Sequence, residues 1–217
     1  MQSEPKSKKQ FVSEFRRSEI ITAARSVFAQ KGYLNATVDE IALAAGLAKG
    51  TIYVYFSSKE EIYTAAIEND LEILRQRTLQ NIAAAGTVLE KISAYINSRF
   101  DYCEERRDFF RITYFEPAGP PTSPLLSKVR AREWLREPVN QLALAIQSDA
   151  NYSGILPWQA EALAWAVADL TTGALQRRLG STPATTARQD ADFLIGMVYA
   201  ALSNPSMPIS EERTTLA

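Results

Sequence analysis

The stretch Thr37–Lys59, with the sequence TVDEIALAAGLAKGTIYVYFSSK, predicts two short helices joined by a tight turn. Thr37 and Glu40 match a capping box, in which the Thr hydroxyl and the Glu carboxylate each accept a hydrogen bond from the other residue's backbone N–H. Gly46 is suited to end this helix, because glycine adopts the left-handed conformation at a helix C-terminus without steric cost. A second helix is expected over residues 48–55, and the Ser-Ser-Lys-Glu-Glu run at 57–61 can start a third. This order is typical of a helix-turn-helix motif.

The second helix has an unusual composition for a helix of a protein core. Ile52 and Phe56 lie four residues apart and can face inward. The outer face then carries a glycine, one charge and three hydroxyl groups, from Lys49, Gly50, Thr51, Tyr53 and Tyr55. Glycine costs a helix about 1 kcal/mol relative to alanine, but its missing side chain leaves room for a nucleic-acid backbone or base edge. Two interpretations stay open on spacing alone: a helix that contacts DNA, and a solvated helix whose tyrosine rings pack on the surface.

Residues 20–67 contain, in this order, Ala23-Ala24, Phe28, Gly32-Tyr33, Ala36-Thr37-Val38, Ile41-Ala42, Ala45-Gly46, Lys49-Gly50-Thr51-Ile52-Tyr53, Tyr55-Phe56 and Ser58-Lys59-Glu60. Residues of the same types follow one another in the same order in the DNA-binding domain of the TetR family of bacterial transcriptional regulators, which residues 20–67 therefore resemble. The resemblance covers about the first third of the chain. It implies an all-α fold, with an N-terminal three-helix helix-turn-helix DNA-binding domain and a larger helical domain for ligand binding and dimerisation.

The resemblance also implies roles for single residues. Lys49, Gly50, Thr51 and Tyr53 would lie at the DNA, and Thr37, Tyr55 and Lys59 would touch phosphates. Two departures limit this transfer. Ala48 replaces a frequent serine, which removes a helix cap, and Val54 replaces a frequent histidine, which leaves an apolar contact to a thymine methyl as the direct readout there. The operator sequence is therefore not predictable.

Composition excludes several classes of protein. The 217 residues include no histidine, the commonest general base and metal ligand, so we expect neither an enzyme nor a metal or other cofactor. The single Cys103 cannot form an internal disulfide and is typical of a reducing compartment. No apolar run approaches the ~18 residues that span a bilayer, and no signal-peptide pattern follows the first lysines. We expect a cytoplasmic protein without a membrane association.

Charge is unevenly distributed along the chain. Residues 1–60 carry nine Lys and Arg against six Asp and Glu, a net charge of +3, which leaves −4 for the rest of a chain with net charge −1. This suits a protein that touches DNA with one part only. The expected organisation is a flexible basic arm at 1–12, the DNA-binding domain at 13–60, a helical regulatory and dimerisation domain at 61–205, and a disordered tail at 206–217.

Apolar positions at helical spacing recur along both domains. They predict a helix over about 13–31 in the first domain. Beyond it they predict helices over about 59–85, 88–107, 108–115, 125–150 and 158–179, and a last helix that starts at Pro183. Asp70 is a candidate break point in the helix over 59–85, and Pro138 is a candidate kink in the helix over 125–150. No segment of the sequence shows a pattern that favours a β-strand over these helices.

The last two helices usually form a four-helix dimer interface in the family, so the resemblance implies a homodimer. Candidate interface residues are Ala162, Trp165, Ala166, Leu170, Gly173, Ile195 and Val198, although the same composition would suit a monomer core. The middle helices are expected to enclose a regulatory pocket for a small apolar or aromatic effector. Its candidate lining is Phe100, Cys103, Phe109, Phe110, Tyr114 and Trp134, with ordinary core packing as the competing interpretation of each.

These observations favour a ligand-responsive repressor that binds a palindromic double-stranded DNA operator as a dimer. The alternative is a DNA-binding adaptor of the same fold, whose body docks a protein partner and has no small-molecule ligand. An internal cavity would favour the first hypothesis, and an exposed apolar patch outside the dimer face would favour the second.

Overall fold

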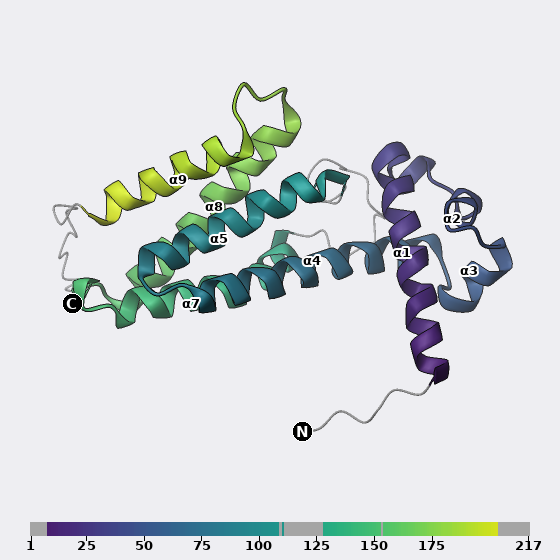
Figure 1. Ribbon diagram of the computed structural model, residues 1–217, viewed down its shortest axis with the longest axis horizontal. Helices are drawn as coiled ribbons and strands as arrows, with labels where there is room; N and C mark the ends of the chain where they lie inside the picture. The colour runs from purple at the N-terminus through teal and green to yellow at the C-terminus, as the bar shows by residue number, and fades with distance from the viewer. Residues whose placement is uncertain (1–7, 109, 111–127, 153, 204–217) are drawn as a thin grey trace, which may run out of the picture.

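The computed structural model describes residues 8–108, 110, 128–152 and 154–203, and every regular element among them is a helix (Figure 1). In order these are α1 (Lys8–Asn35), α2 (Val38–Ala44), α3 (Lys49–Tyr55), α4 (Lys59–Ala84), α5 (Val88–Glu105), α7 (Lys128–Ser148), a 3-10 turn (Ala150–Tyr152), α8 (Pro157–Gly180) and α9 (Ala187–Leu202). The predicted all-α fold is confirmed. Within the described ranges no helix combines the length and the apolar character that crossing a membrane requires.

The helix ends around the turn follow local chemistry, as predicted. The Thr37 hydroxyl accepts from the Glu40 N–H at 3.3 Å, and the Glu40 carboxylate accepts from the Thr37 N–H at 3.1 Å, which completes the capping box of α2. Gly46 has a φ of +66°, and the N–H of Leu47 reaches back to the carbonyl of Ala42 at 2.9 Å. This left-handed stop closes α2 and turns the chain into α3.

Two predicted helix starts differ from the structure. Helix α1 begins at Lys8, so residues 8–12 are helical although they were expected in a flexible arm; residues 1–7 lie outside the described ranges. Residues 8–12 include Lys and Gln and contain neither Gly nor Pro, so nothing in the sequence stops the helix at residue 13. Helix α9 begins at Ala187 instead of Pro183, because Thr186 and Gln189 form a capping box at that point.

Two candidate interruptions do not end a helix. Helix α7 includes Pro138, and α4 passes through Asp70 without a break. Asp70 is fully buried, and its carboxylate accepts hydrogen bonds from the side chains of Arg25, Tyr102 and Arg106. A polar side chain inside a helix is compatible with helical backbone when partners on neighbouring helices satisfy it.

The N-terminal domain, formed by α1, α2, α3 and the first turns of α4, has a small apolar core. Phe28 of α1 and Tyr63 of α4 meet edge to face with ring centroids 5.0 Å apart, and Tyr33 packs against both rings. Ile41 of α2 and Ile52 of α3 are fully buried beside them. The boundary expected between residues 60 and 61 therefore falls inside α4, which belongs to both parts of the molecule.

Lys59, the first residue of α4, joins that helix to the end of α1. Its ammonium group donates to the carbonyl oxygens of Tyr33 at 2.7 Å, Ala36 at 2.9 Å and Leu34 at 3.4 Å. The same nitrogen lies 4.4 Å from the Tyr33 ring centroid. These carbonyls belong to the short turn that follows a kink in α1 at Gly32, whose φ is +77°, and the cation satisfies carbonyl groups that have no helical partner.

The body is an elongated bundle into which α4 runs from the N-terminal domain (Figure 1). Helix α4 packs against α5 and α7, α7 against α8, and α9 against α5 and α8. The core between them is apolar and includes the fully buried rings of Tyr95 and Phe100. Residues 206–217 and most of the predicted segment 108–115 lie outside the described ranges.

Replacing Lys59 with methionine tests its structural role. We expect Lys59→Met to lower the free energy of unfolding by about 1–3 kcal/mol, because carbonyls at the end of α1 lose hydrogen bonds to a charged donor. Lys31→Met is the matched control, since Lys31 forms an ion pair with Glu40 on the surface and should cost less than about 1 kcal/mol. Urea denaturation of both variants measures the difference, and equal stabilities would contradict the capping role.

Candidate nucleic-acid interface

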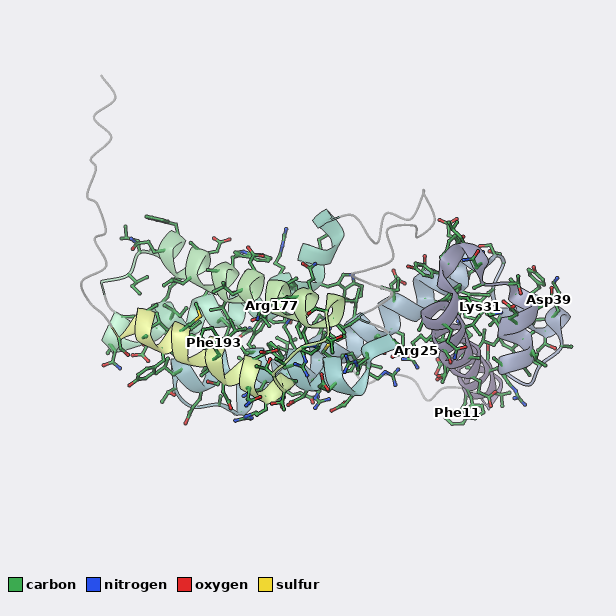
Figure 2. The ribbon with its side chains drawn as sticks, turned by 90° about the horizontal axis from the view of Figure 1, so that it is seen from above. Phe11, Arg25, Lys31, Asp39, Arg177 and Phe193 are labelled. Atoms are coloured by element: carbon green, nitrogen blue, oxygen red, sulfur yellow. The ribbon has the colours of Figure 1, made fainter. Side chains whose placement is uncertain are left out.

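Helix α3 presents its polar face to solvent at the end of the molecule far from the body. Tyr53 and Val54 are 49% and 75% exposed, whereas Ile52 and Phe56 are 0% and 1% exposed. The predicted inward position of Ile52 and Phe56 is confirmed. Figure 2 places Asp39 of the neighbouring α2 at the same outer end, opposite the helices of the body. The exposed side chains of α3 can therefore reach an extended partner without obstruction by the body.

Gly50 lies on this exposed face, and the protein itself does not need a glycine there. A methyl group added at its Cα would meet no atom within 4 Å, and its backbone is helical. The helix would be more stable with alanine at this position. The open space in front of Gly50 is thus available to a molecule that approaches the backbone of α3 closely.

Lys49 does not extend freely into solvent. Its ammonium group lies 2.8 Å from a carboxylate oxygen of Asp39 on α2. The hydrogen bond to Asp39 raises the pKa of Lys49, so the side chain stays charged. Both side chains are at least half exposed, at 51% and 64%, and water screens such pairs strongly. Lys49 can exchange Asp39 for a phosphate or a base without disturbing the fold.

The three residues expected at phosphates differ in availability. Thr37 is exposed but uses its hydroxyl in the α2 capping box, and Tyr55 is half-buried at the end of α3. Lys59 directs its ammonium group to the carbonyls of Tyr33, Leu34 and Ala36. A phosphate contact from Lys59 would have to replace some of these hydrogen bonds.

Sequence reasoning did not single out Arg17, which holds the far end of α3. Its guanidinium group donates to the Tyr55 carbonyl at 2.6 Å and lies 4.1 Å above the Phe56 ring. This caps the C-terminus of α3 and ties it to α1. Arg17 and Tyr55 are 38 positions apart in the sequence, so no local sequence pattern indicates this contact, and only the folded structure reveals it.

The candidate dimer residues lie on α8 and α9, and none of them is buried within the protomer. Ala162, Ala166, Leu170 and Gly173 are exposed, and Trp165, Ile195 and Val198 are half-buried. Other large apolar side chains of the same two helices are also exposed, namely Trp158, Phe193, Met197 and Tyr199. Phe193, which Figure 2 labels on α9, is 65% exposed. We refer to this surface of α8 and α9 as the apolar face.

A groove of about 160 Å³ opens in the apolar face. Ala166, Leu170 and Val198 form part of its wall, and Ile92 and Ile146 of the helices beneath also line it. All of the lining residues are apolar. The groove thus coincides with the predicted dimer surface and not with the predicted regulatory pocket.

The candidate pocket residues have a different environment from this groove. Phe100, Cys103 and Phe110 are each 1% exposed and belong to the packed core, and Trp134 is half-buried. Burial raises the pKa of the Cys103 thiol to about 11, so it is protonated at neutral pH and unsuited to act as a nucleophile. Phe109 and Tyr114 lie outside the described ranges. The pocket stays a prediction.

Comparison with known proteins agrees with this architecture. Residues 20–66 match the family described as bacterial regulatory proteins, tetR family. A curated relative, the HTH-type transcriptional activator FasR of Mycolicibacterium smegmatis, is 31% identical over 99 residues, which are 46% of this chain and 45% of that protein. The chain spans about half the length of the curated relatives it matches, from 45% to 50% for the first two.

Solved structures share the fold over most of the chain. The transcriptional regulator FadR of Bacillus subtilis, in complex with stearoyl-CoA, superposes with a TM-score of 0.70 at 22% identity, over 83% of this chain and 96% of that chain. AibR, in complex with isovaleryl coenzyme A and operator DNA, superposes with a TM-score of 0.64 at 18% identity, over 84% and 97%. Residues 20–66 therefore carry a DNA-binding domain of the tetR family of bacterial regulatory proteins, and the all-helical chain shares the fold of these solved structures.

Proposed function

We propose that this protein is a cytoplasmic, non-enzymatic transcriptional regulator that binds a palindromic DNA operator as a homodimer. The observation that carries the proposal is the exposed face of α3, where Lys49 and Tyr53 flank the open space at Gly50. A short helix with donors on its outer face and an apolar inner face fits the major groove.

The apolar face of α8 and α9 supports the dimer. Isolated apolar residues are common on protein surfaces, but several large ones on two adjacent helices indicate an interaction site. A second copy that packs on this surface in two-fold symmetry would cover the groove and place two copies of α3 on the same side of one duplex. The half-sites would lie about one helical turn, ~34 Å, apart.

Repression is the simpler direction of regulation. Occupation of a promoter by the dimer is sufficient to block transcription, whereas activation requires a further productive contact with the transcription machinery. The body is proposed to have two conformations, one that spaces the two α3 helices to match the operator and one that does not. An effector that binds the second conformation more tightly would release the operator. The loss of operator affinity is set by the difference between the effector's affinities for the two conformations.

The proposed effector is an acyl-coenzyme A thioester. This choice rests on the two neighbours whose structures hold stearoyl-CoA and isovaleryl coenzyme A. The body also contains a buried cation, because Arg99 of α5 is 3% exposed and donates to the Thr172 hydroxyl of α8 at 3.3 Å. An apolar interior with an internal guanidinium suits a ligand that combines an acyl chain with polar or anionic groups.

The adaptor alternative receives less support. It calls for an exposed apolar surface on the body that is separate from the dimer face. Among the described body residues, the large exposed apolar side chains gather on α8 and α9, while Leu144 of α7 and Ile73 of α4 stand on other helices. The exposed Phe11 and Phe15 belong to α1.

Selection of bound sequences from random duplex DNA tests the function directly. We expect the purified protein to enrich a palindrome at moderate salt, where binding through charge alone is weakened. No enrichment, together with binding that vanishes as salt rises, would contradict a sequence-specific regulator.

Gly50→Ala separates DNA binding from stability. The variant should be as stable as the wild type, or up to about 1 kcal/mol more stable, because the added methyl group meets no protein atom. It should bind the selected operator roughly tenfold more weakly, because the methyl group occupies space used by DNA. Tyr53→Ala and Lys49→Ala should also weaken binding and leave the dimer intact. Unchanged affinity in all three variants would show that α3 does not read DNA.

Leu170→Glu tests the apolar face. Leu170 is 45% exposed, so the protomer tolerates a carboxylate there, but burying it in the dimer should weaken dimerisation by at least roughly 30-fold. Leu144→Glu is the matched control, because Leu144 is 55% exposed on α7. Sedimentation velocity should find monomer for the first variant and dimer for the second. Dimers in both would place the interface elsewhere.

Fluorescence anisotropy with labelled operator tests the effector. We expect acyl-CoA thioesters of at least one chain length to weaken operator binding by roughly 5- to 150-fold. Free coenzyme A and free fatty acid serve as controls, because each supplies only half of the proposed recognition. If no thioester changes operator affinity, the acyl-CoA proposal is wrong, while the DNA-binding proposal stands on its own test.

A further inference from the structure

Two polar clusters meet at the C-terminal end of α5, over the last helical turn and the C-cap residue Arg106 (residues 102–106), which we call the α5 end. One cluster connects the α5 end to the N-terminal domain, and the other connects it to α8 and α9. Each cluster is centred on one strongly buried charged group, Asp70 in the first and Arg178 in the second, while Arg106 and Glu104 at their edges are partly exposed.

The first cluster surrounds Asp70 of α4. Arg25 of α1 donates to both carboxylate oxygens of Asp70, at 2.6 and 2.7 Å. From the α5 end, the Tyr102 hydroxyl donates to Asp70 at 2.7 Å and Arg106 donates at 3.0 Å. Burial raises the pKa of Asp70, and the hydrogen bond from Tyr102 and the charge of Arg25 oppose that rise. Arg25 lies where the N-terminal domain joins the body (Figure 2).

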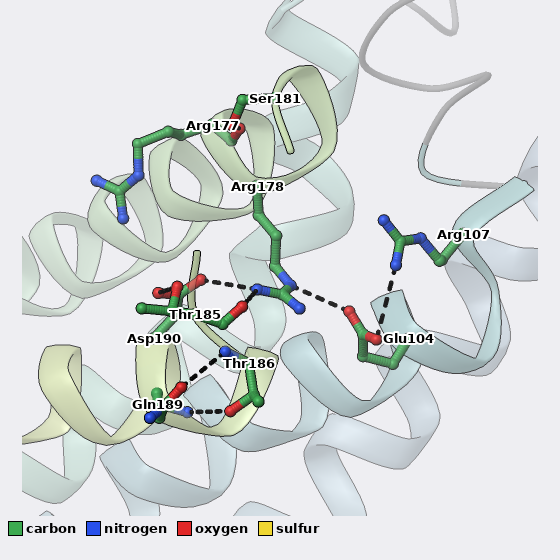
Figure 3. Close-up of polar contacts among 9 residues, drawn as sticks. All are labelled: Glu104, Arg107, Arg177, Arg178, Ser181, Thr185, Thr186, Gln189 and Asp190. Atoms are coloured by element: carbon green, nitrogen blue, oxygen red, sulfur yellow. Dashed lines mark hydrogen bonds and ion pairs between the residues drawn. The ribbon is translucent and has the colours of Figure 1, made fainter. Parts of the chain in front are cut away.

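The second cluster surrounds Arg178 of α8, whose side chain is 7% exposed. Its guanidinium group donates to the carboxylate of Glu104 in the α5 end at 3.0 Å. It also donates to the Thr185 carbonyl at 2.7 Å and to the Asp190 carboxylate of α9 at 3.2 Å (Figure 3). Arg178 therefore joins both helices of the apolar face to α5.

The two clusters hold opposite sides of one turn. Residues four apart in a helix share a side, so Tyr102 and Arg106 both reach Asp70. Glu104 is two residues from each, which rotates it by about 200° around the helix axis, toward α8 and α9. A shift of the α5 end thus has to move both sets of contacts together.

We infer that Tyr102 and Glu104 are positioning residues that couple the apolar face of α8 and α9 to the orientation of the N-terminal domain. The path runs from Asp190 and Arg178 through the α5 end to Asp70 and Arg25. It rests on the proposed function, because the orientation matters only if two N-terminal domains must match one operator. Phe100 lies just before the α5 end and Cys103 within it, both buried in the core, so a change in body packing at these residues would reach the path directly.

A double-mutant cycle on operator binding tests the inference. Tyr102→Phe removes the hydroxyl that holds Asp70, and Glu104→Gln removes the charge that faces Arg178. Each should weaken operator binding by roughly 2- to 30-fold while the dimer remains intact. Both contacts belong to the same path, so breaking either one already interrupts it. The operator affinity of the double variant should therefore be no lower than that of the single variant with the larger loss. Asp192→Asn is the matched control, since Asp192 forms an exposed ion pair with Arg188 within α9, away from the α5 end, and should leave affinity unchanged.

The outcomes separate the possible failures. Wild-type affinity in both single variants would overturn the inference, as would losses that multiply in the double variant, because independent effects indicate local packing alone. The inference would also be overturned if the loss of operator affinity in each variant were proportional to its loss in free energy of unfolding, measured by urea denaturation. A wild-type protein that selects no operator would refute the proposed function itself, before any variant is compared.

Discussion

The buried carboxylate of Asp70 is the contact on which the arrangement of the two parts of the molecule depends. It lies in the middle of α4 and accepts hydrogen bonds from Arg25 of α1, from Tyr102 of α5 and from Arg106 directly after α5. Taking this carboxylate out of water is costly, and the two cations and the hydroxyl offset that cost. Removal of one member of such a buried pair typically destabilises a protein by roughly 3–5 kcal/mol. The N-terminal domain is therefore held to the body by directional contacts as well as by apolar packing.

The same physical chemistry sets the pose of α3. Lys59 satisfies carbonyls at the end of α1, and Arg17 caps the end of α3 and lies over Phe56. Both side chains are cationic and belong to a domain with net positive charge, yet they serve the fold. Lys49 differs, because its partner Asp39 is exposed and easily exchanged. Charge counts over residues 1–60 thus overstate the number of cations available to DNA.

In the body, buried aromatic side chains and the open groove occupy different places. Phe100, Cys103 and Phe110 fill the core at 1% exposure. The groove is lined by residues of α8 and α9, three of which were expected at a dimer interface. Apolar side chains at helical spacing specify that a helix has a buried face. They do not specify whether another helix, a ligand or a second protomer covers that face.

Local sequence by itself determined the helix-turn-helix. Thr37 with Glu40, Ser58 with Glu61, and Gly46 fix where helices begin and end, because caps act over three or four residues. Local chemistry left two helix starts misplaced, at Lys8 and Ala187, since several candidate ends compete in those segments. Only the tertiary structure decided the roles of Arg17, Lys59, Asp70 and Arg178. Their partners lie far away in the chain, and the energy of a charged side chain depends on which groups surround it after folding.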